Sequence, residues 1–222
     1  MWIDISMPLF PGMPTFPGDP PFAAEPVRRV DRGAPYSLSR LSLGSHAGTH
    51  VDPPSHFFPA GRPVDQLDLE ILQGPCRVVD VGPRGREIQA EELATVPAGT
   101  SRLLLRTPNS PRWARRLEFF PDYVGLGLPA ARRLAEQGVR LVGIDALSVE
   151  SDPTEAFPVH RELLGRGIVI LEGLLLEPAR AGRYELACLP LLWKDGDGGP
   201  ARAALRPTGA TATGSRAKGG AR

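Results

Sequence analysis

The order of hydrophobic and polar residues predicts a domain made largely of short strands. Residues 36–43 alternate between polar and apolar side chains in the way that is typical of a half-buried strand. Residues 184–193 and 201–205 predict a closing hairpin, because the segment between them is rich in aspartate and glycine. Further strands are predicted in short, largely apolar segments: residues 2–5, 76–81, 102–106, 141–146 and 168–171.

Helical patterns are fewer. The clearest covers residues 129–137, where Pro129 suits the first turn and Gly138 ends the helix. Residues 157–164 predict a shorter helix, and residues 88–96 also have a helical pattern. Since strands outnumber helices and only some of them alternate with helices, we expect a mixed α/β domain with a sizeable sheet.

The chain organisation points to one domain. Its 222 residues suffice for one core, and its 25 prolines and 25 glycines indicate many turns and rigid loops, which argues against a helical bundle. We expect a single domain over residues 1–206, opened by a Pro-rich, mostly extended arm over residues 1–22. Residues 207–222 combine basic residues with Gly, Ala and Thr and lack acids, so they are predicted to be a disordered basic tail.

Charge and cysteine content exclude several classes of protein. A formal net charge of +1 argues against a strongly basic nucleic-acid binder. The apolar runs are much shorter than the ~18–20 residues that a membrane span needs, and the N-terminus has no signal-peptide pattern. Cys76 and Cys188 form neither a CxxC pair nor a disulfide framework. We therefore expect a cytoplasmic protein without membrane or nucleic-acid partners.

Three of the four histidines fall within the segment SHAGTHVDPPSHF, residues 45–57. His46, His50, Asp52 and His56 all have even numbers, so an extended backbone would direct them to one face. The glycine and prolines of the segment oppose a helix, which separates it from the helical HExxH zinc motif. Because imidazole and carboxylate are preferred ligands of zinc and, more weakly, of manganese or iron, the segment predicts a metal site.

His160 and Glu172 are the remaining candidate ligands. His160 lies in the first turn of the predicted short helix, and Glu172 ends an apolar strand. A carboxylate at the end of a buried strand needs a partner, because an unpaired buried charge is costly. A metal ion and an arginine would both serve, and the residues alone leave both open.

The segment HAGTHVDPPSHF resembles the HxGTHxDxPxHF signature of the cyclase family, which includes bacterial kynurenine formamidases and isatin hydrolases. The resemblance continues through TFPGDPPF, LVGIDALSVESD, FPVHRELLGRGIVILEGL and CLPLLWKDGDGGPARAAL, almost the whole chain short of the tail. It implies an α/β fold: a single mixed-sheet domain with a β-barrel-like core and flanking helices, the swivelling β/β/α fold of the family.

The resemblance also implies roles for the candidate residues. His46, His50 and Asp52 match the ligands of the family's first metal. Asp52 would bridge to a second metal, whose other ligands match His160 and Glu172. His56, the third histidine of the signature, matches the family's proposed general acid/base.

Two departures from the formamidase pattern leave the substrate open. Phe16 stands where formamidases carry a tryptophan that lines the pocket, which keeps an aromatic wall but removes the indole N–H donor. The stretch between Ser148 and His160 also lacks the D-S-K sequence that many formamidases carry there.

The activity that the resemblance implies is metal-dependent hydrolysis of an aryl formamide, most closely N-formyl-L-kynurenine to L-kynurenine and formate, a step of tryptophan breakdown. One or two Zn²⁺ ions per subunit, or Mn²⁺, would activate a water molecule. His56 would take the proton from this water and pass it to the leaving aryl amine, while the aryl ring rests on Phe16.

Other readings of the same residues remain. An isatin hydrolase-like enzyme acting on a cyclic amide or lactone would use the same ligand set. A non-catalytic metal-binding protein is a different class, and His56 beside a complete ligand set argues against it. As partners we expect a small-molecule substrate and a second copy of the chain. In a homodimer or homotetramer, the exposed-looking Phe10, Met13 and Phe16 would cross the interface.

Overall fold

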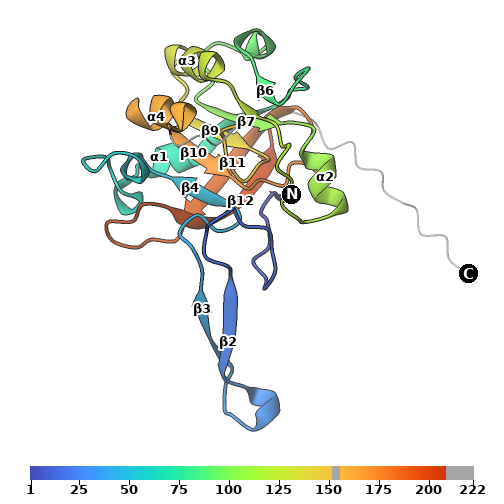
Figure 1. Ribbon diagram of the computed structural model, residues 1–222, viewed down its shortest axis with the longest axis vertical. Coiled ribbons are helices and arrows are strands. Elements are labelled where there is room, and N and C mark those ends of the chain that lie inside the picture. Colours follow the sequence, from blue (N-terminus) through green and yellow to red (C-terminus); the bar gives the residue numbers. More distant parts are fainter. Residues whose placement is uncertain (152–155, 209–222) are drawn as a thin grey trace, which may run out of the picture.

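The computed structural model describes residues 1–151 and 156–208. Its centre is a mixed sheet that closes into a barrel-like ring in the order β12, β11, β5, β7, β9, β10 and β4, with β4 pairing again to β12 (Figure 1). This confirms the expected α/β fold with a sizeable sheet. The strands of the ring are β4 (His50–Asp52), β5 (Gln73–Asp80), β7 (Arg102–Arg106), β9 (Leu141–Ile144), β10 (Val169–Glu172), β11 (Gly182–Pro190) and β12 (Gly199–Pro207).

Strands β7, β9 and β10 of the ring are buried on both faces, which explains their continuous apolar runs. Strands β5, β7, β9 and β10 run parallel, and such strands are normally covered on both faces. Leu104 and Leu171 belong to the core cluster of the ring's interior, whereas Leu103, Leu105 and Ile170 belong to the cluster on its outer face. Alternate residues of one strand therefore serve two cores.

The outer face carries the predicted helices. α3 (Leu128–Glu136) begins with Pro129 in its first turn, and α4 (Pro158–Gly165) packs beside it on the ring (Figure 1). The predicted closing hairpin is confirmed as β11 and β12, and the predicted strand at residues 2–5 is β1 (Ile3–Asp4) on the edge of β12. The helical pattern of residues 88–96 becomes only the 3-10 turn Ala90–Leu93, preceded by β6 (Glu87–Ile88).

The remaining elements were not predicted. They are β2 (Ala23–Arg28), β8 (Gly125–Leu126), α1 (Leu69–Leu72), α2 (Ser110–Arg115) and the 3-10 turns Val30–Arg32, Pro54–His56 and Val64–Gln66. All are short, and short elements are fixed by their neighbours more than by their own periodicity.

The strand predicted within residues 36–43 exists as β3 (Leu38–Ser42), but the expectation that it is half-buried is wrong. β3 pairs with β2 in a hairpin that projects from the body, and every residue of β3 is exposed (Figure 1). The alternating pattern identified the strand correctly. Its apolar side chains, Leu38 and Leu41, nevertheless find no core in the described part of the same chain.

The Pro-rich arm lies against the body. Met13 is buried, and Phe10 and Phe16 pack against the outer core. The expectation that these three side chains are exposed is therefore wrong for Met13 and only partly correct for the two phenylalanines. Of the predicted tail, Pro207 closes β12, whereas residues 209–222 lie outside the described residues. None of the helices in the described part of the chain is long and apolar enough to cross a membrane.

Candidate active site

The register between two strands creates the site. β4 runs antiparallel to β10 so that His50 stands opposite Glu172 and Asp52 opposite Ile170. Directly opposite residues of antiparallel strands have Cβ atoms about 4.5–5.5 Å apart. The pairing thus brings the His50 imidazole to the Glu172 carboxylate, with 3.3 Å between Nε2 and Oε2.

Two backbone segments touch beside this pair. Gly173 follows β10 with φ 65°, and a Cβ atom at this position would lie 2.1 Å from the carbonyl oxygen of Gly48. Any larger residue would push the segment that precedes β4 away from the end of β10. The close approach therefore holds the histidine segment against the strand that supplies Glu172.

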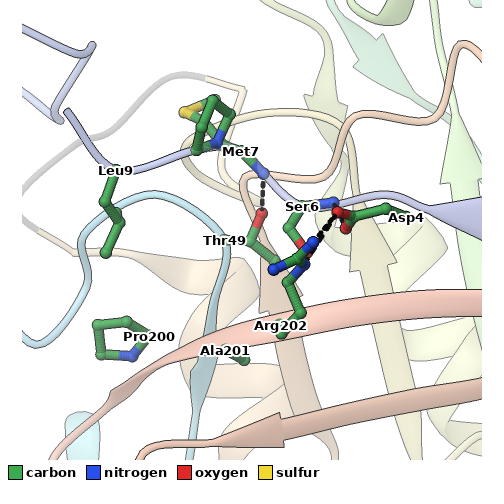
Figure 2. A pocket seen from close by; sticks show the side chains of 9 residues that line it. Asp4, Ser6, Met7, Leu9, Thr49, Pro200, Ala201 and Arg202 are labelled. Carbon is green, nitrogen blue, oxygen red and sulfur yellow. Dashed lines mark hydrogen bonds and ion pairs between the residues drawn. The ribbon is translucent and has the colours of Figure 1, made fainter.

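Thr49 fastens the same contact from the other side. Its hydroxyl donates to the Gly173 carbonyl at 2.6 Å and accepts from the Met7 backbone N–H at 2.7 Å. Figure 2 shows the second bond beside a cavity of about 400 Å³. The charged groups that line this cavity, Asp4 and Arg202, form an ion pair with each other, so the cavity offers no unpaired charge from its lining.

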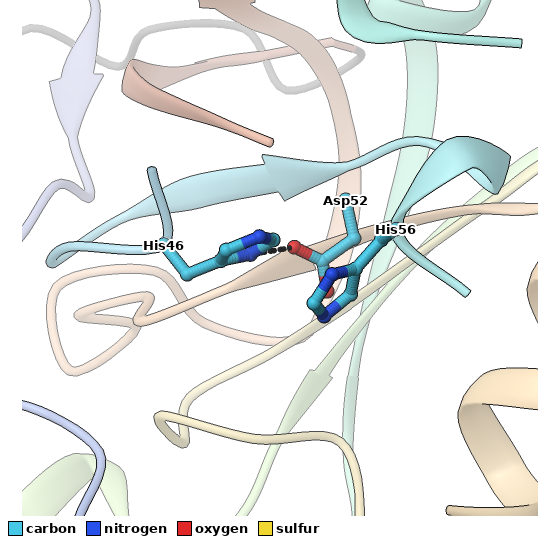
Figure 3. Close-up of side chains that lie close together, drawn as sticks. All are labelled: His46, Asp52 and His56. Carbon is cyan, nitrogen blue, oxygen red and sulfur yellow. Dashed lines mark hydrogen bonds and ion pairs between the residues drawn. The ribbon is translucent and has the colours of Figure 1, made fainter. Parts of the chain in front are cut away.

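The predicted ligands converge on Asp52. Its Oδ1 lies 2.7 Å from His46 Nδ1 and 3.3 Å from His50 Nε2, and its Oδ2 lies 3.8 Å from His160 Nε2. His160 Nε2 is also 3.3 Å from Glu172 Oε1. Figure 3 shows the side chains of His46 and His56 directed at Asp52 from either side. The structure thus brings all the sequence-predicted candidates for the metal site into one cluster.

The backbone reaches this arrangement differently from the expectation. Only His50–Asp52 is a strand, whereas His46 lies in a turn and His56 ends the 3-10 turn Pro54–His56. The even spacing therefore predicted the correct grouping through an extended backbone that exists only in its central part.

Two candidate ligand atoms of the cluster have no hydrogen-bond partner in the described part of the chain. His46 Nε2 and Asp52 Oδ2 are buried without a hydrogen bond among the described residues. His50 Nδ1 bonds the Gly48 carbonyl at 2.9 Å, and His160 Nδ1 lies 3.2 Å from Glu150 Oε1, which leaves each Nε2 facing the carboxylates. Buried donor atoms of this kind suit a divalent metal ion such as zinc or manganese.

The geometry groups the ligand atoms into two triads that share Asp52. The first contains His46, Asp52 and His56, the second His50, Asp52 and Glu172, and the atoms of each lie within 4.8 Å of one another. The shared Asp52 agrees with the resemblance to the cyclase family. The histidines are distributed differently, because that resemblance places His50 beside His46 and keeps His56 free as a base.

The electrostatics of the cluster favour positive charge. Burial raises the pKa of the Asp52 carboxyl, but the neighbouring His50 and His46 outweigh it and hold that pKa well below its usual value. Burial lowers the pKa of His160, but Glu150 and Glu172 raise it to about 10. The buried carboxylates thus attract protons to the imidazoles in the absence of metal, and a bound cation would replace those protons.

His56 behaves in the opposite way. Burial, reinforced by repulsion from His46 and His160, lowers the pKa of His56 to about 4, although Asp52 and Glu172 act against this shift. Its ring centroid lies 4.0 Å from that of His46 and 6.1 Å from that of His160. His56 is therefore a neutral imidazole at the edge of the ligand cluster.

The cluster opens into a cavity of about 570 Å³. Phe16, Phe57 and Phe157 give the cavity its aromatic walls, and Asp19 and Ser148 are among its polar lining. Phe157 has φ 43°, a rare conformation for a bulky residue and one that often accompanies functional sites. The cavity therefore joins the ligand cluster to an aromatic slot of the size of a small-molecule substrate.

Sequence reasoning found Phe16 but missed Asp19, Phe57, Phe157 and Glu150. Asp19 and Phe57 stand inside or beside segments already recognised as motifs, so their position was a usable signal. Glu150 and Phe157 also lie in segments that carry the resemblance, LVGIDALSVESD and FPVHRELLGRGIVILEGL, but nothing in those segments marks Glu150 as the partner of His160, which it meets through the approach of α4. The partners of Glu172 among the described residues are His50, His160 and the Val149 N–H, which donates at 2.6 Å, and an arginine is not among them.

Comparisons of the sequence agree with one another. The Cyclase family model, whose description reads "Putative cyclase", matches residues 3–151. A kynurenine formamidase of Geobacillus thermodenitrificans (strain NG80-2) is 40% identical over 215 residues, which cover 94% of this chain and 98% of that protein. A kynurenine formamidase of Bacillus cereus (strain ATCC 14579) is 38% identical over 208 residues, covering 93% and 97%.

Solved structures share the fold over nearly the whole chain. One is described as "The Structure Of Potential Metal-Dependent Hydrolase With Cyclase Activity", with a TM-score of 0.80, 30% identity and coverage of 95% of this chain and 99% of the other. Isatin hydrolase A from Labrenzia aggregata, bound to benzyl benzoate, has a TM-score of 0.78 at 26% identity, with 94% of each chain covered.

Proposed function

The chain belongs to the cyclase family, and on that premise we propose that it hydrolyses an aryl formamide, N-formyl-L-kynurenine, to L-kynurenine and formate. It is a metal-dependent hydrolase that acts on a small molecule. The observation that carries the choice of substrate class is one cavity that unites three elements: a ligand cluster, the neighbouring His56 and walls of phenylalanine. The kynurenine formamidase relatives support the same substrate.

We assign the ligand roles to His46, His50, Asp52, His160 and Glu172. A divalent ion held there would lower the pKa of a bound water and polarise the formyl carbonyl. The buried second partners, Gly48 for His50 and Glu150 for His160, keep the Nε2 atoms aimed at the cluster. The formyl group is the smallest acyl group, so it reaches the cluster while the ring stays between the aromatic walls.

We assign the proton transfer to His56. A neutral imidazole beside the ligand cluster accepts the proton that a reacting water loses, and as imidazolium it donates that proton to the nitrogen of the leaving aryl amine. Phe16 and Phe57 hold the ring of the substrate and exclude water from this side of the cavity. The amine leaves as a neutral product because it receives the proton as the amide bond breaks.

Zinc, one or two ions per subunit, is our choice of metal, with manganese as the second candidate. The imidazole-rich donor set supports zinc, and the carboxylates of Asp52 and Glu172 accommodate manganese as well. Metal-stripped protein reloaded with each ion separately, with turnover and bound metal both measured, decides between them.

The activity is tested on N-formyl-L-kynurenine with wild-type protein and His56→Ala. We expect metal-dependent hydrolysis by the wild type and a kcat about 10²–10⁴-fold lower in the variant, with the metal content unchanged. Loss of metal from His56→Ala would instead make His56 a ligand, as one geometric triad allows. Hydrolysis of isatin but not of the formamide, by protein that binds metal, would replace the proposed substrate with a cyclic amide.

We also propose that two copies of the chain associate through the β2–β3 hairpin. A two-stranded hairpin alone is marginally stable in water. This one displays Val27, Val30, Tyr36, Leu38 and Leu41 at 47–58% exposure. A second copy would cover these side chains, and light scattering measures the association.

A cytoplasmic location is our proposal for the compartment. Cys76 and Cys188 are both buried free thiols, and burial raises the pKa of each to about 12. Such thiols behave as packing residues and require no oxidising environment. Fractionation of the source cells with an antibody against the protein tests this assignment.

A further inference from the structure

A tight turn places an aromatic ring and a carboxylate on the same rim of the cavity. The Asp19 N–H donates to the Phe16 carbonyl at 3.0 Å, with Pro17 and Gly18 between them and Gly18 at φ 100°. This is the pattern of a type II turn, in which the first and fourth Cα atoms lie within about 7 Å. Proline and glycine both suit these positions, so the spacing of Phe16 and Asp19 is fixed before any ligand binds.

The Asp19 carboxylate is unmatched in its surroundings. The described residues give it neither an ion pair nor a side-chain hydrogen bond, and neither Lys nor Arg is among the described residues that line the cavity. The other lining carboxylate, Glu172, is already engaged by His50 and His160. Partial burial, together with the nearby Glu172 and Asp52, raises the pKa of Asp19 despite attraction from His46 and His50.

We propose that Asp19 binds the ammonium group of an amino-acid substrate, and thereby selects aryl formamides that carry an α-amino acid side chain. This inference rests on the proposed function and names its specificity determinant. In N-formyl-L-kynurenine the ammonium is attached to the ring through a carbonyl, a methylene and the α-carbon. A ring held at Phe16 thus presents its ammonium to the carboxylate at the other end of the same turn. The exposed position of Asp19 lets the substrate's own carboxylate remain in solvent.

The test uses a pair of substrates with Asp19→Asn. 2-Formamidoacetophenone has the same formamide, ring and ketone as N-formyl-L-kynurenine but lacks the amino acid. We expect KM for N-formyl-L-kynurenine to rise about five- to tenfold at unchanged kcat, as for loss of one partly exposed charge-assisted hydrogen bond. The kinetics of 2-formamidoacetophenone should not change. Asp19→Glu should recover part of the lost affinity, and Glu136→Gln, an exposed acid on α3, is the control.

Binding of the products separates failure of this inference from failure of the proposed function. Calorimetry on the metal-loaded protein should show weaker binding of L-kynurenine to Asp19→Asn and unchanged binding of 2-aminoacetophenone. This selective loss would support the role of Asp19 even if neither formamide were hydrolysed. Equal losses for both members of either pair, or a lower metal content in Asp19→Asn, would overturn it and assign Asp19 to the metal site or the turn.

Discussion

His56 and His160 show how strongly neighbours decide what one residue type does. Both line the same cavity, yet the pKa of His56 falls to about 4 and that of His160 rises to about 10. His160 has Glu150 and Glu172 beside it, whereas His56 faces two other histidines. Without a metal, His160 is the positively charged one of the two imidazoles and His56 is neutral. This difference distinguishes a candidate ligand from a candidate base.

At the scale of single residues, the histidine segment was predictable from the sequence. The residue that orients His160, Glu150, was not. His46, His50, Asp52 and His56 stood out because scarce residues gathered in one short stretch. Glu150 is one of three acids between Ser148 and Phe157, and nothing in its neighbours along the chain distinguishes it as the buried partner of a histidine. Its position became significant only when the fold brought the start of α4 to it.

Glu150 is a positioning residue for His160. Its Oε1 accepts from the backbone N–H groups of Val159 and His160 at 2.8 and 2.9 Å and lies 3.2 Å from His160 Nδ1. We expect Glu150→Gln to weaken metal binding about 10–100-fold, because it changes the group that orients a ligand. Competition with a chromophoric chelator measures the affinity. Glu162→Gln on α4, the helix that carries His160, is the matched control. An unchanged metal affinity in Glu150→Gln would contradict the positioning role of Glu150.

Among the elements, those with a long apolar face were predicted well. β7 and α3 appear within one residue of the predicted ranges, because buried runs and a helix start with proline carry strong local signals. β4 and β3 show that local signals do not report the pairing partners of a strand or what covers it. β4 is only His50–Asp52 long and exists through its pairing partners, and the burial of β3 depends on what lies across from it.

The loop after β9 carries an unusual buried acid. Asp145 accepts hydrogen bonds from the backbone N–H and hydroxyl groups of Thr107 and Ser110, which tie the end of β9 to the start of α2. Burial nevertheless raises the pKa of Asp145 to about 6, and the hydrogen bonds only partly oppose this shift. The folded state thus binds this proton more tightly than the unfolded chain does.

Stability should therefore depend on pH through Asp145. Its stabilising contribution is complete below about pH 4 and is lost as the pH rises through about 6, a change of about 3 kcal/mol in the free energy of unfolding. Denaturant unfolding of wild type and Asp145→Asn between these pH values isolates the effect, since Asn does not titrate. A stability difference between the two proteins that stays constant with pH would disprove this linkage.

For the whole molecule, the resemblance to the cyclase family predicted the barrel-like core and the flanking helices. Local patterns alone gave a sheet of unknown closure, because strand order depends on contacts between distant parts of the chain. The ring closes only where β12 meets β4, through Gly199 opposite Val51 and Pro200 opposite His50. The projecting hairpin was equally invisible, since its alternating strand looks the same whether a core or another subunit covers it.

The association of two copies can be tested on this hairpin. We expect wild-type protein to be a dimer or larger, and Leu38→Asp with Leu41→Asp to give monomers, because the two positions lie on opposite faces of β3 and at least one introduced charge would have to be buried whichever face the second copy covers. Multi-angle light scattering reads out the mass, and Leu192→Asp in the loop between β11 and β12 controls for loss of an exposed leucine. Wild-type protein that is monomeric at micromolar concentration would refute the proposed interface.

The closure of the ring by β12 has a consequence for biosynthesis. β4 is held by β10 and by the first residues of β12, both of which the ribosome makes after it. At roughly 5–20 residues per second, the chain between Asp52 and Gly199 takes on the order of 10 s to translate. β10 is complete by residue 172, but until Gly199 is made the histidine segment lacks its pairing with β12. The pairing that fixes this end of the site is therefore a late product of synthesis, completed only once the start of β12 has been made.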